Sequence, residues 1–166
     1  ADGAVAAVTD QPIDGCPCIV VPDTGTALLQ IAAYYRKKFS PILVGVTGSV
    51  GKTTTKEMIA LVLSAAFETL KTQGNLNNEI GLPKTLLHLA PKHKAAVIEM
   101  GMSHFGEIHR LSCTTQPTIG VITNIGFSHI ENLGSQEGIL KAKLEILDGM
   151  QPDAPLILNA DDPHLA

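Results

Sequence analysis

The chain contains no tryptophan, few other aromatic residues and only three cysteines among its 166 residues. Cys16, Cys18 and Cys113 are an odd number without a second closely spaced pair, which argues against both a disulfide framework and a zinc site. The sequence also lacks the roughly 20 consecutive apolar residues that cross a bilayer, and no basic stretch followed by an apolar one opens it. We therefore expect a soluble protein of the cytoplasm that spans no membrane.

Positive charge is scarce as well. The net charge is -4 at pH 7, so no broad basic surface is available to nucleic acid or to an anionic membrane, and any anion must be bound locally. Arg36 and Arg110 are the only arginines, too few for the arginine-rich lid of a small-molecule kinase. The chain does have 45% hydrophobic residues against 17% charged ones, a balance typical of a folded domain with a core.

Two regions differ in their pattern. Residues 1–39 hold two short strands and one helix, which bury little core, so we interpret them as the end of a smaller α/β domain plus a linking helix. Ser40-Pro41 marks the boundary, because proline disfavours helix in the residue before it. Residues 40–166 form the main domain. The elements expected in the first region are strands at 3–8 and 19–21 and a helix from Asp23 or Thr24 to Phe39.

The most informative stretch is Val44–Lys56, V-G-V-T-G-S-V-G-K-T-T-T-K. An apolar strand runs into a turn with two glycines, and a segment of helical periodicity starts at Lys52. Strand, glycine loop and helix form a cradle in which backbone N–H groups bind phosphate, a lysine reaches the terminal phosphates and a hydroxyl serves Mg²⁺. The predicted ATP-binding residues are Thr47, Gly48, Ser49, Val50, Gly51, Lys52, Thr53 and Thr54.

This loop is a variant of the general phosphate-loop pattern. The pattern places its first glycine at the position of Val46, whereas the first loop glycine here is Gly48. A chance glycine turn is the alternative interpretation, and strand, helix, two glycines and Lys52-Thr53 in combination disfavour it. No element of the N-K-x-D type that reads guanine follows the loop, so adenine is the expected base.

From Ile42 onward, predicted strands alternate with predicted helices. This alternation predicts an α/β fold of the phosphate-loop type, a three-layer domain with a mostly parallel sheet and helices on both faces. The helix over 52–66 is expected to bury a broad apolar side formed by Met58, Ile59, Leu61, Val62 and Leu63. The strands are expected at 42–46, 95–98, 119–123 and 156–158, and the other helices at 82–89, 106–111 and 137–150.

Open parallel sheets bind ligands beyond the carboxyl ends of their strands. Glu99 follows the strand at 95–98, where its carboxylate can share Mg²⁺ with Thr53; an exposed strand-end glutamate is the alternative. Asn124 and His129 follow the next strand. Polar groups that several strands bring to one edge indicate a site more strongly than any of them alone.

Two further features leave alternatives open. The segment Gly74–Gly81, G-N-L-N-N-E-I-G, can form a self-capped loop or bind a sugar or peptide substrate. Lys141 and Lys143 lie in the helix expected at 137–150, where a lysine usually keeps its charge in water, and the pattern favours neither of them. The asparagines of the segment are Asn75, Asn77 and Asn78.

With these segments in view, the chain resembles the Mur ligase family, the ATP-dependent amide ligases of bacterial peptidoglycan synthesis. It is most similar to the members that add D-alanyl-D-alanine to UDP-N-acetylmuramoyl-tripeptide. Four stretches carry the resemblance: T-G-S-V-G-K-T-T-T-K-E-M from Thr47, G-N-L-N-N-E-I-G-L-P from Gly74, E-M-G-M-S-H-F-G-E-I from Glu99 and T-N-I-G-F-S-H-I-E-N-L-G-S-Q-E-G-I-L-K-A-K-L-E-I from Thr123. A fifth, L-N-A-D-D-P from Leu158, is less specific.

The resemblance implies catalytic roles for Lys52, Glu99, His129 and Lys143. Lys52 would hold the β- and γ-phosphates of ATP, Thr53 and Glu99 a first Mg²⁺, and His129 would help to hold a second. In this family a lysine carries a metal-ligating carbamate, and only the family comparison, through the spacing from His129, assigns it to Lys143. The implied contacts to the UDP-muramoyl-peptide are Asn75, Asn77, Asn78 and Asn124.

The family has three domains, and this chain resembles the end of the first and most of the second. We therefore expect the 166 residues alone not to form the amide, and the full-length enzyme to act as a monomer. Lys84 stands where the family leads us to expect an apolar residue, at a position expected to be exposed. Two other functions stay open: another ligase of the superfamily, such as a folylpolyglutamate synthase, and a non-catalytic ATP-binding module that needs one Mg²⁺ instead of two.

Overall fold

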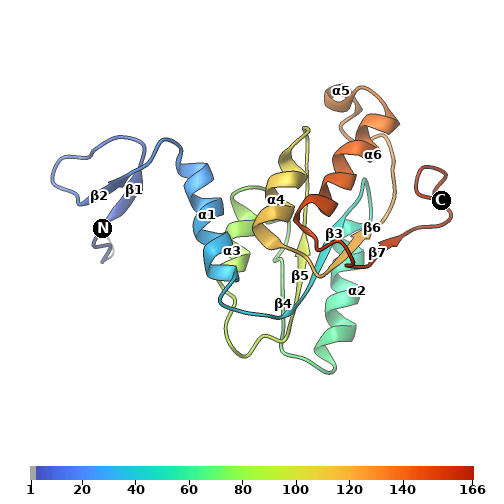
Figure 1. The fold of residues 1–166 in the computed structure, drawn as a ribbon, viewed down its shortest axis with the longest axis horizontal. Helices are drawn as coiled ribbons and strands as arrows, with labels where there is room; N and C mark the ends of the chain where they lie inside the picture. The colour runs from blue at the N-terminus through green and yellow to red at the C-terminus, as the bar shows by residue number, and fades with distance from the viewer. Residues whose placement is uncertain (1–2) are drawn as a thin grey trace.

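The computed structural model describes residues 3–166, so residues 1 and 2 of the predicted first region lie outside the described residues. A small sheet stands apart from the main body and is joined to it by helix α1 (Thr24–Arg36) (Figure 1). Its two strands, β1 (Ala7–Thr9) and β2 (Cys18–Val20), pair in parallel. Both strands and the helix are confirmed, with β1 shorter than predicted and α1 ending before Phe39.

Helix α1 is tied to the main body by its side chains. At its start the Asp23 carboxylate accepts from the backbone N–H of Thr26 at 2.6 Å, which caps the helix. Near its end the Tyr35 hydroxyl donates to the carbonyl oxygen of Leu89 at 3.0 Å, and the Arg36 guanidinium donates to the carbonyl of Thr115 at 2.8 Å. The linking helix is therefore part of the packing of the main body.

The main body is built on five strands in the order β4-β5-β3-β6-β7, and every pairing between them is parallel. The predicted parallel sheet is confirmed, with one strand, β4, that the sequence did not predict. The strands are β3 (Ile42–Thr47), β4 (Thr69–Lys71), β5 (Ala95–Glu99), β6 (Ile119–Ile122) and β7 (Leu156–Leu158).

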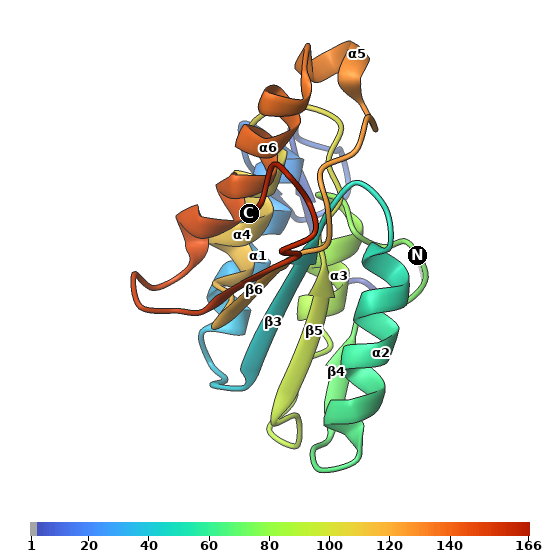
Figure 2. The ribbon, with the colours of Figure 1, turned by 90° about the vertical axis from the view of Figure 1, so that its right-hand side faces the viewer.

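Helices cover both faces of this sheet, which confirms the predicted three-layer fold (Figure 2). Successive residues of β3 point to opposite faces: Leu43 joins the core under α1 and its neighbours, and Val44 joins the smaller core under α2. The helix predicted over 137–150 changes to a 3-10 turn after Leu144. The helical segments are α2 (Lys52–Ser64), α3 (Gly81–Leu86), α4 (Glu107–Thr115), α5 (Ile130–Leu133), α6 (Gln136–Leu144) and the turn η1 (Glu145–Gly149).

The predicted apolar side of α2 is partly wrong. Met58, Leu61 and Val62 are 64%, 75% and 72% exposed, respectively, while Lys56 and Ala60 are buried. The helix has apolar residues on most sides of its own circumference, so the sequence does not tell which of them face the sheet. In the structure, Ile59 and Leu63 are partly buried against the sheet. A buried lysine on the sheet side places a charge close to the end of β5.

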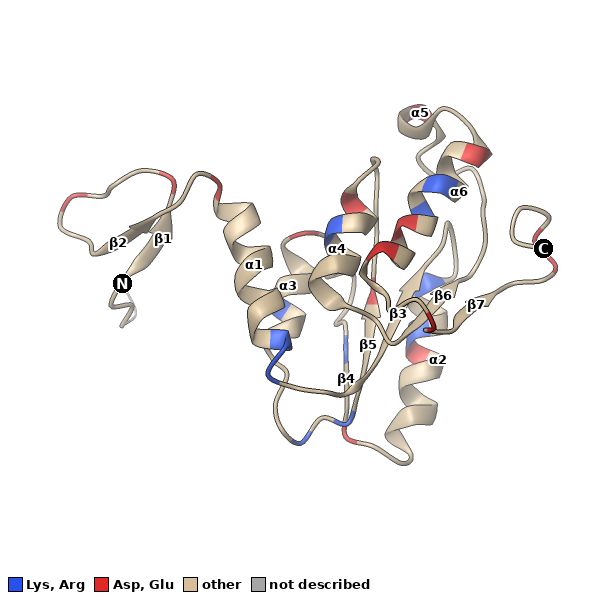
Figure 3. Cartoon of the chain, viewed as in Figure 1, with Lys and Arg blue, Asp and Glu red and all other residues tan. Residues whose placement is uncertain are grey.

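Charged residues of both signs are interspersed over the helices and loops (Figure 3). Within residues 3–166, no helix combines the length and the apolar character needed to cross a membrane. Lys84 is exposed, as expected.

Candidate active site

The loop between β3 and α2 lies at the carboxyl edge of the sheet. Lys52, the first residue of α2, folds back over it, and its Nζ donates to the carbonyl oxygens of Gly48 at 2.9 Å and Ser49 at 3.4 Å. Burial lowers the pKa of Lys52, and the charge of Glu99 opposes that shift. The Lys52 ammonium therefore lies over the phosphate loop, where it can contact a phosphate that the loop binds.

The position of the first loop glycine has a steric reason. Gly48 has a φ of +147°, and a Cβ at this position would lie 1.9 Å from the side-chain oxygen of Thr123. Val46, where the general pattern has glycine, is fully buried within β3. A side chain at position 48 would therefore clash with the segment that follows β6, which is why glycine is needed there.

The segment that follows β6 holds the phosphate loop from one side. The side-chain oxygen of Asn124 accepts from the backbone N–H groups of Ser49 at 3.1 Å and Val50 at 3.0 Å. The Thr123 hydroxyl donates to the carbonyl of Val50 at 2.6 Å, and the Gly126 N–H donates to the Ser49 hydroxyl at 2.8 Å. Asn124, predicted as a substrate contact, therefore uses its side-chain oxygen to position the loop.

Glu99 is the last residue of β5 and is only 1% exposed, so the alternative of an exposed strand-end glutamate is wrong. Its carboxylate accepts from the Thr53 hydroxyl at 3.1 and 3.3 Å and from the side-chain nitrogen of Asn77 at 2.8 Å. The Nζ of Lys56 lies 3.5 Å from the same carboxylate and donates to the carbonyl of Gly74 at 3.2 Å. Nothing in the sequence pattern pointed to Lys56.

The asparagine segment shows one of the two uses left open by its sequence, the self-capped loop. The side-chain oxygen of Asn78 accepts from the N–H groups of Ile80 at 3.1 Å and Gly81 at 2.8 Å, which caps the start of α3. Asn77 instead turns toward Glu99, as described above, and Asn75 is exposed. Self-capping thus accounts for one of the three asparagines and leaves Asn77 at the carboxyl edge of the sheet.

Burial distinguishes the two lysines of α6. Lys143 is 2% exposed, whereas Lys141 is exposed. Burial, and after it the charge of Lys52, lowers the pKa of Lys143 to about 7. His129 precedes α5 with a φ of 64°, a left-handed conformation that few residues other than glycine adopt. The structure therefore separates Lys143 from Lys141, which the sequence pattern could not do.

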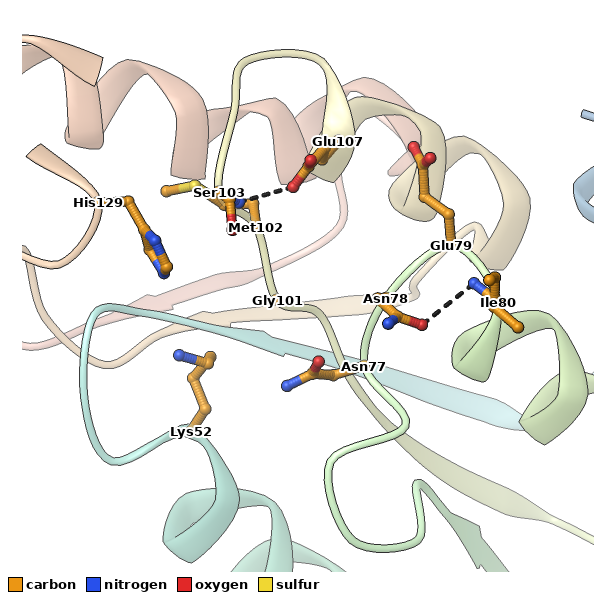
Figure 4. A pocket seen from close by; sticks show the side chains of 10 residues that line it. All are labelled: Lys52, Asn77, Asn78, Glu79, Ile80, Gly101, Met102, Ser103, Glu107 and His129. Carbon is orange, nitrogen blue, oxygen red and sulfur yellow. Dashed lines mark hydrogen bonds between the residues drawn. The ribbon is translucent and has the colours of Figure 1, made fainter. Parts of the chain in front are cut away.

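A cavity of about 550 Å³ opens beside the phosphate loop (Figure 4). In Figure 4, Lys52 and Asn77 project toward it from below, and His129 from the side of α5. It is bordered by Lys52, Asn77, Asn78, Glu79, Ile80, Gly101, Met102, Ser103, Glu107 and His129. Four of these ten were predicted as site residues, so the structure brings residues from α2, the asparagine segment and the segment before α5 to one place.

Comparison with known proteins assigns the chain to a family. The model of the Mur ligase middle domain matches residues 46–166. The chain belongs to the Mur ligase family. This Mur ligase chain is 50% identical over 164 residues to the UDP-N-acetylmuramoyl-tripeptide–D-alanyl-D-alanine ligase of Synechocystis, a match that covers 96% of the chain and 36% of that relative.

Solved Mur ligase structures have the same fold. MurF from Acinetobacter baumannii is similar with a TM-score of 0.92 at 42% identity, over 97% of this chain and 36% of that one. MurF from Thermotoga maritima, solved in complex with ADP, has a TM-score of 0.91 at 34% identity, over 98% of this chain and 38% of that one. The chain thus spans little more than a third of the length of these relatives.

The Mur ligase chain has donors that suit Mg²⁺ at one of the two predicted metal positions. Thr53 and Glu99 offer a hydroxyl and a carboxylate at hydrogen-bond distance from each other. Within residues 3–166 no three histidine, cysteine or acidic side chains are grouped to hold a metal. Mg²⁺ commonly uses one or two carboxylates with substrate phosphates and water, so the pair fits this ion. At the second position, Lys143 fits only if its amine carries an anionic group.

Six residues at the cavity of this Mur ligase chain were not predicted as site residues. They come from the second half of the asparagine segment and from the stretch that follows β5 and ends at the first residue of α4, and both lie within stretches that carry the family resemblance. The resemblance was therefore the signal that could have found them, because no residue type among them points to a particular chemistry. They are Glu79, Ile80, Gly101, Met102, Ser103 and Glu107.

Proposed function

We propose that the protein carrying this chain is an ATP-dependent amide ligase that adds D-alanyl-D-alanine to UDP-N-acetylmuramoyl-tripeptide and releases ADP, in peptidoglycan synthesis. The observation that carries this proposal is the grouping of Lys52, Thr53 and Glu99 at the carboxyl edge of a parallel sheet, beside a cavity of about 550 Å³. The name of the Synechocystis relative supports the choice of substrates over a folylpolyglutamate.

ATP would bind along residues 47–54, with Lys52 on its β- and γ-phosphates. The contacts of the Lys52 ammonium with the carbonyls of Gly48 and Ser49 would then be replaced by contacts with phosphate. The similar MurF from Thermotoga maritima was solved in complex with ADP, which supports an adenine nucleotide as the ligand. The residues involved would be Thr47, Gly48, Ser49, Val50, Gly51, Lys52, Thr53 and Thr54.

Two Mg²⁺ ions would accompany the nucleotide, one on Thr53 and Glu99 and one on His129 and a carbamate of Lys143. Lys143 suits this modification, because a lysine with a pKa of about 7 is largely neutral just above neutral pH, and the neutral amine is the form that reacts with CO₂. When bound, Mg²⁺ neutralises the negative charge that develops on the transferred phosphoryl group.

The reaction would have two steps. The terminal carboxylate of the tripeptide attacks the γ-phosphorus of ATP, and the bond to the β-phosphate oxygen breaks, so that ADP leaves with the electron pair and an acyl phosphate forms. The amine of D-alanyl-D-alanine then attacks the acyl carbonyl, phosphate leaves and the amine loses a proton. Lys52 would stabilise the charge that builds up in the first step, since carboxylate and triphosphate repel each other.

The asparagine segment would hold the UDP-muramoyl-peptide. Asn77 and Asn78 border the cavity and can offer amide groups to a sugar or peptide. We also propose Asn75 and Asn124 as substrate contacts, the latter through its amide nitrogen, because its oxygen holds the phosphate loop. We expect the protein to work in the cytoplasm as a monomer.

The proposal is tested on the full-length protein by measuring ADP release and the amide product together, with each substrate left out in turn. We expect repeated turnover, with both products in equal amounts, only when all three substrates are present. Lys52→Ala should abolish both, whereas Lys141→Ala, a change at an exposed lysine, should leave them unchanged. ATP binding without amide formation would instead favour the non-catalytic module, and glutamate addition to a folate would favour a folylpolyglutamate synthase.

A further inference from the structure

We infer that Asp162, in the L-N-A-D-D-P stretch, is a positioning residue for nucleotide binding, because it fixes the segment after β6 that holds the phosphate loop. This inference rests on the proposed function, since it assigns the residue a part in ATP binding at the same site. Asp162 is not among the residues that border the cavity, so it would act through other residues.

Asp162 is a buried acid with both of its oxygens in use. It is 8% exposed. One carboxylate oxygen accepts from the backbone N–H of Ile125 at 2.7 Å, and the other accepts from the N–H of His164 at 2.9 Å. These two hydrogen bonds lower the pKa of Asp162, and the hydrogen bond from Ile125 has the larger effect. Hydrogen bonds to an ionised acceptor are among the stronger ones in proteins, so Ile125 is firmly held.

The peptide groups on both sides of Ile125 are fixed. Its N–H is bound by Asp162, and its carbonyl accepts from the side-chain nitrogen of Gln136, at the start of α6, at 3.3 Å. Its two chain neighbours, Asn124 and Gly126, are the residues that contact Ser49 and Val50 of the phosphate loop. A displacement of Ile125 therefore moves the groups that position the loop.

The loop has little room to absorb such a displacement. A Cβ at Gly48 would lie 1.9 Å from the Thr123 hydroxyl, and a Cβ at Gly126 would lie 3.2 Å from the Cβ of Ser49. Because the two backbones are this close, the segment after β6 and the phosphate loop must shift together. The N–H groups that bind phosphate depend on the same loop geometry. Loss of the Asp162 carboxylate is therefore expected to weaken nucleotide binding.

Asp161 provides a matched control within the same stretch. It has the same side chain and is the next residue along the chain, but it is exposed. Its backbone N–H donates to the Asn159 side chain at 3.1 Å, a contact that a side-chain change at Asp161 leaves intact. Any effect of the shared sequence context is therefore common to both aspartates, which differ in burial and in the hydrogen bonds that the Asp162 carboxylate accepts from Ile125 and His164.

The test uses the full-length protein and compares Asp162→Ala, Asp162→Asn and Asp161→Ala. We expect Asp162→Ala to raise the Kd of ATP about tenfold, the size of effect expected for a lost hydrogen bond to a charged group. The KM of the UDP-muramoyl-peptide should change by less than about twofold, as expected for a change that leaves the cavity walls intact. Asp162→Asn keeps an acceptor for the N–H of Ile125, so its ATP affinity should fall by less than that of Asp162→Ala. Asp161→Ala should bind ATP as the wild type does.

A double-mutant cycle with Asn124→Ala separates positioning from general stability. If Asp162 acts through the segment that contains Asn124, the two changes together should weaken ATP binding by less than the product of their separate effects. Three results would each overturn the inference. The effects of Asp162→Ala and Asn124→Ala could multiply as independent effects do, folded Asp162→Ala could bind ATP as tightly as the wild type, or Asp162→Ala could weaken both substrates equally. If Asp162→Ala does not fold, Asp162→Asn decides by the same criteria. Failure of the wild type to bind ATP would overturn the proposed function as well.

Discussion

The ammonium group of Lys56 lies 3.5 Å from the carboxylate of Glu99, and the two side chains are 0% and 2% exposed. The same lysine contacts Glu57 at 3.2 Å and donates to the carbonyl of Gly74, so it joins α2, the end of β5 and the asparagine segment. A buried charge of one sign is tolerated when the opposite charge lies beside it. Lys56 therefore places a compensating positive charge beside the buried carboxylate of Glu99.

Replacing Lys56 should destabilise the fold. Lys56→Met removes the charge and leaves the buried Glu99 without its cation, which should lower the free energy of unfolding by about 3 kcal/mol. Urea denaturation followed by circular dichroism measures this change. The matched control, Lys84→Met on the exposed side of α3, should stay within about 0.5 kcal/mol of the wild type. Equal stability of the two variants would contradict the role given to Lys56.

Gly48→Ala tests the close approach of the phosphate loop to Thr123. The new Cβ would clash with the Thr123 hydroxyl, and a φ of +147° is strained for alanine. We expect a loss of at least about 2 kcal/mol in the free energy of unfolding, together with weaker ATP binding. Gly25→Ala is the control: its Cβ would meet Asp23 at an ordinary 3.5 Å, within helix α1, and should stabilise by up to about 1 kcal/mol. A stable Gly48→Ala variant with wild-type ATP affinity would refute the steric argument.

The sequence predicted those parts of the fold that local patterns determine. The strand, glycine turn and helix around Lys52 are encoded by adjacent residues, and so is the acid at the end of β5. Strand β4 was missed because T-L-K is short and carries no alternation of its own; it forms by pairing with β5. The buried face of α2 was predicted in part wrongly, because the apolar residues of that helix lie on most sides of its circumference.

The sequence could not predict what depends on contacts between distant segments. Lys56 and Lys143 look like ordinary helix lysines, and only the packing of other elements around them shows that both are buried. Likewise, the hydrogen bonds of Asn124 to the phosphate loop follow from the pairing of β6 with β3. The family resemblance could single out Lys143, because the resemblance identifies this lysine by its sequence spacing from His129 and needs no knowledge of which lysine is buried.

Glu99→Gln should specifically weaken the dependence on Mg²⁺. The amide keeps the size of the side chain and one acceptor for Thr53 or Asn77, but it removes the negative charge that attracts the ion. We expect the Mg²⁺ concentration for half-maximal ADP release to rise at least about tenfold. Glu68→Gln, at an exposed position, should leave it unchanged. A Glu99→Gln enzyme with the Mg²⁺ dependence of the wild type would exclude Glu99 as a ligand.

Lys143 should take up CO₂ as the pH rises through about 7. Burial and the charge of Lys52 lower its pKa from 10.5, and a lysine with a lowered pKa becomes neutral, and so reactive toward CO₂, above that lowered value. At constant dissolved carbon-13-labelled CO₂, the carbamate signal in nuclear magnetic resonance should be weak at about pH 6 and strong by about pH 8. This pH range distinguishes Lys143 from a lysine in water.

The assignment of that signal depends on two matched variants. Lys143→Arg keeps a positive charge but has no amine that can form the carbamate, so it should lose both the signal and amide formation. Lys141→Arg should keep both, because Lys141 is exposed and two residues away on the same helix. A signal that survives in Lys143→Arg, or that rises only near pH 10.5, the ordinary pKa of lysine, would show that burial of Lys143 does not prepare it for carbamate formation.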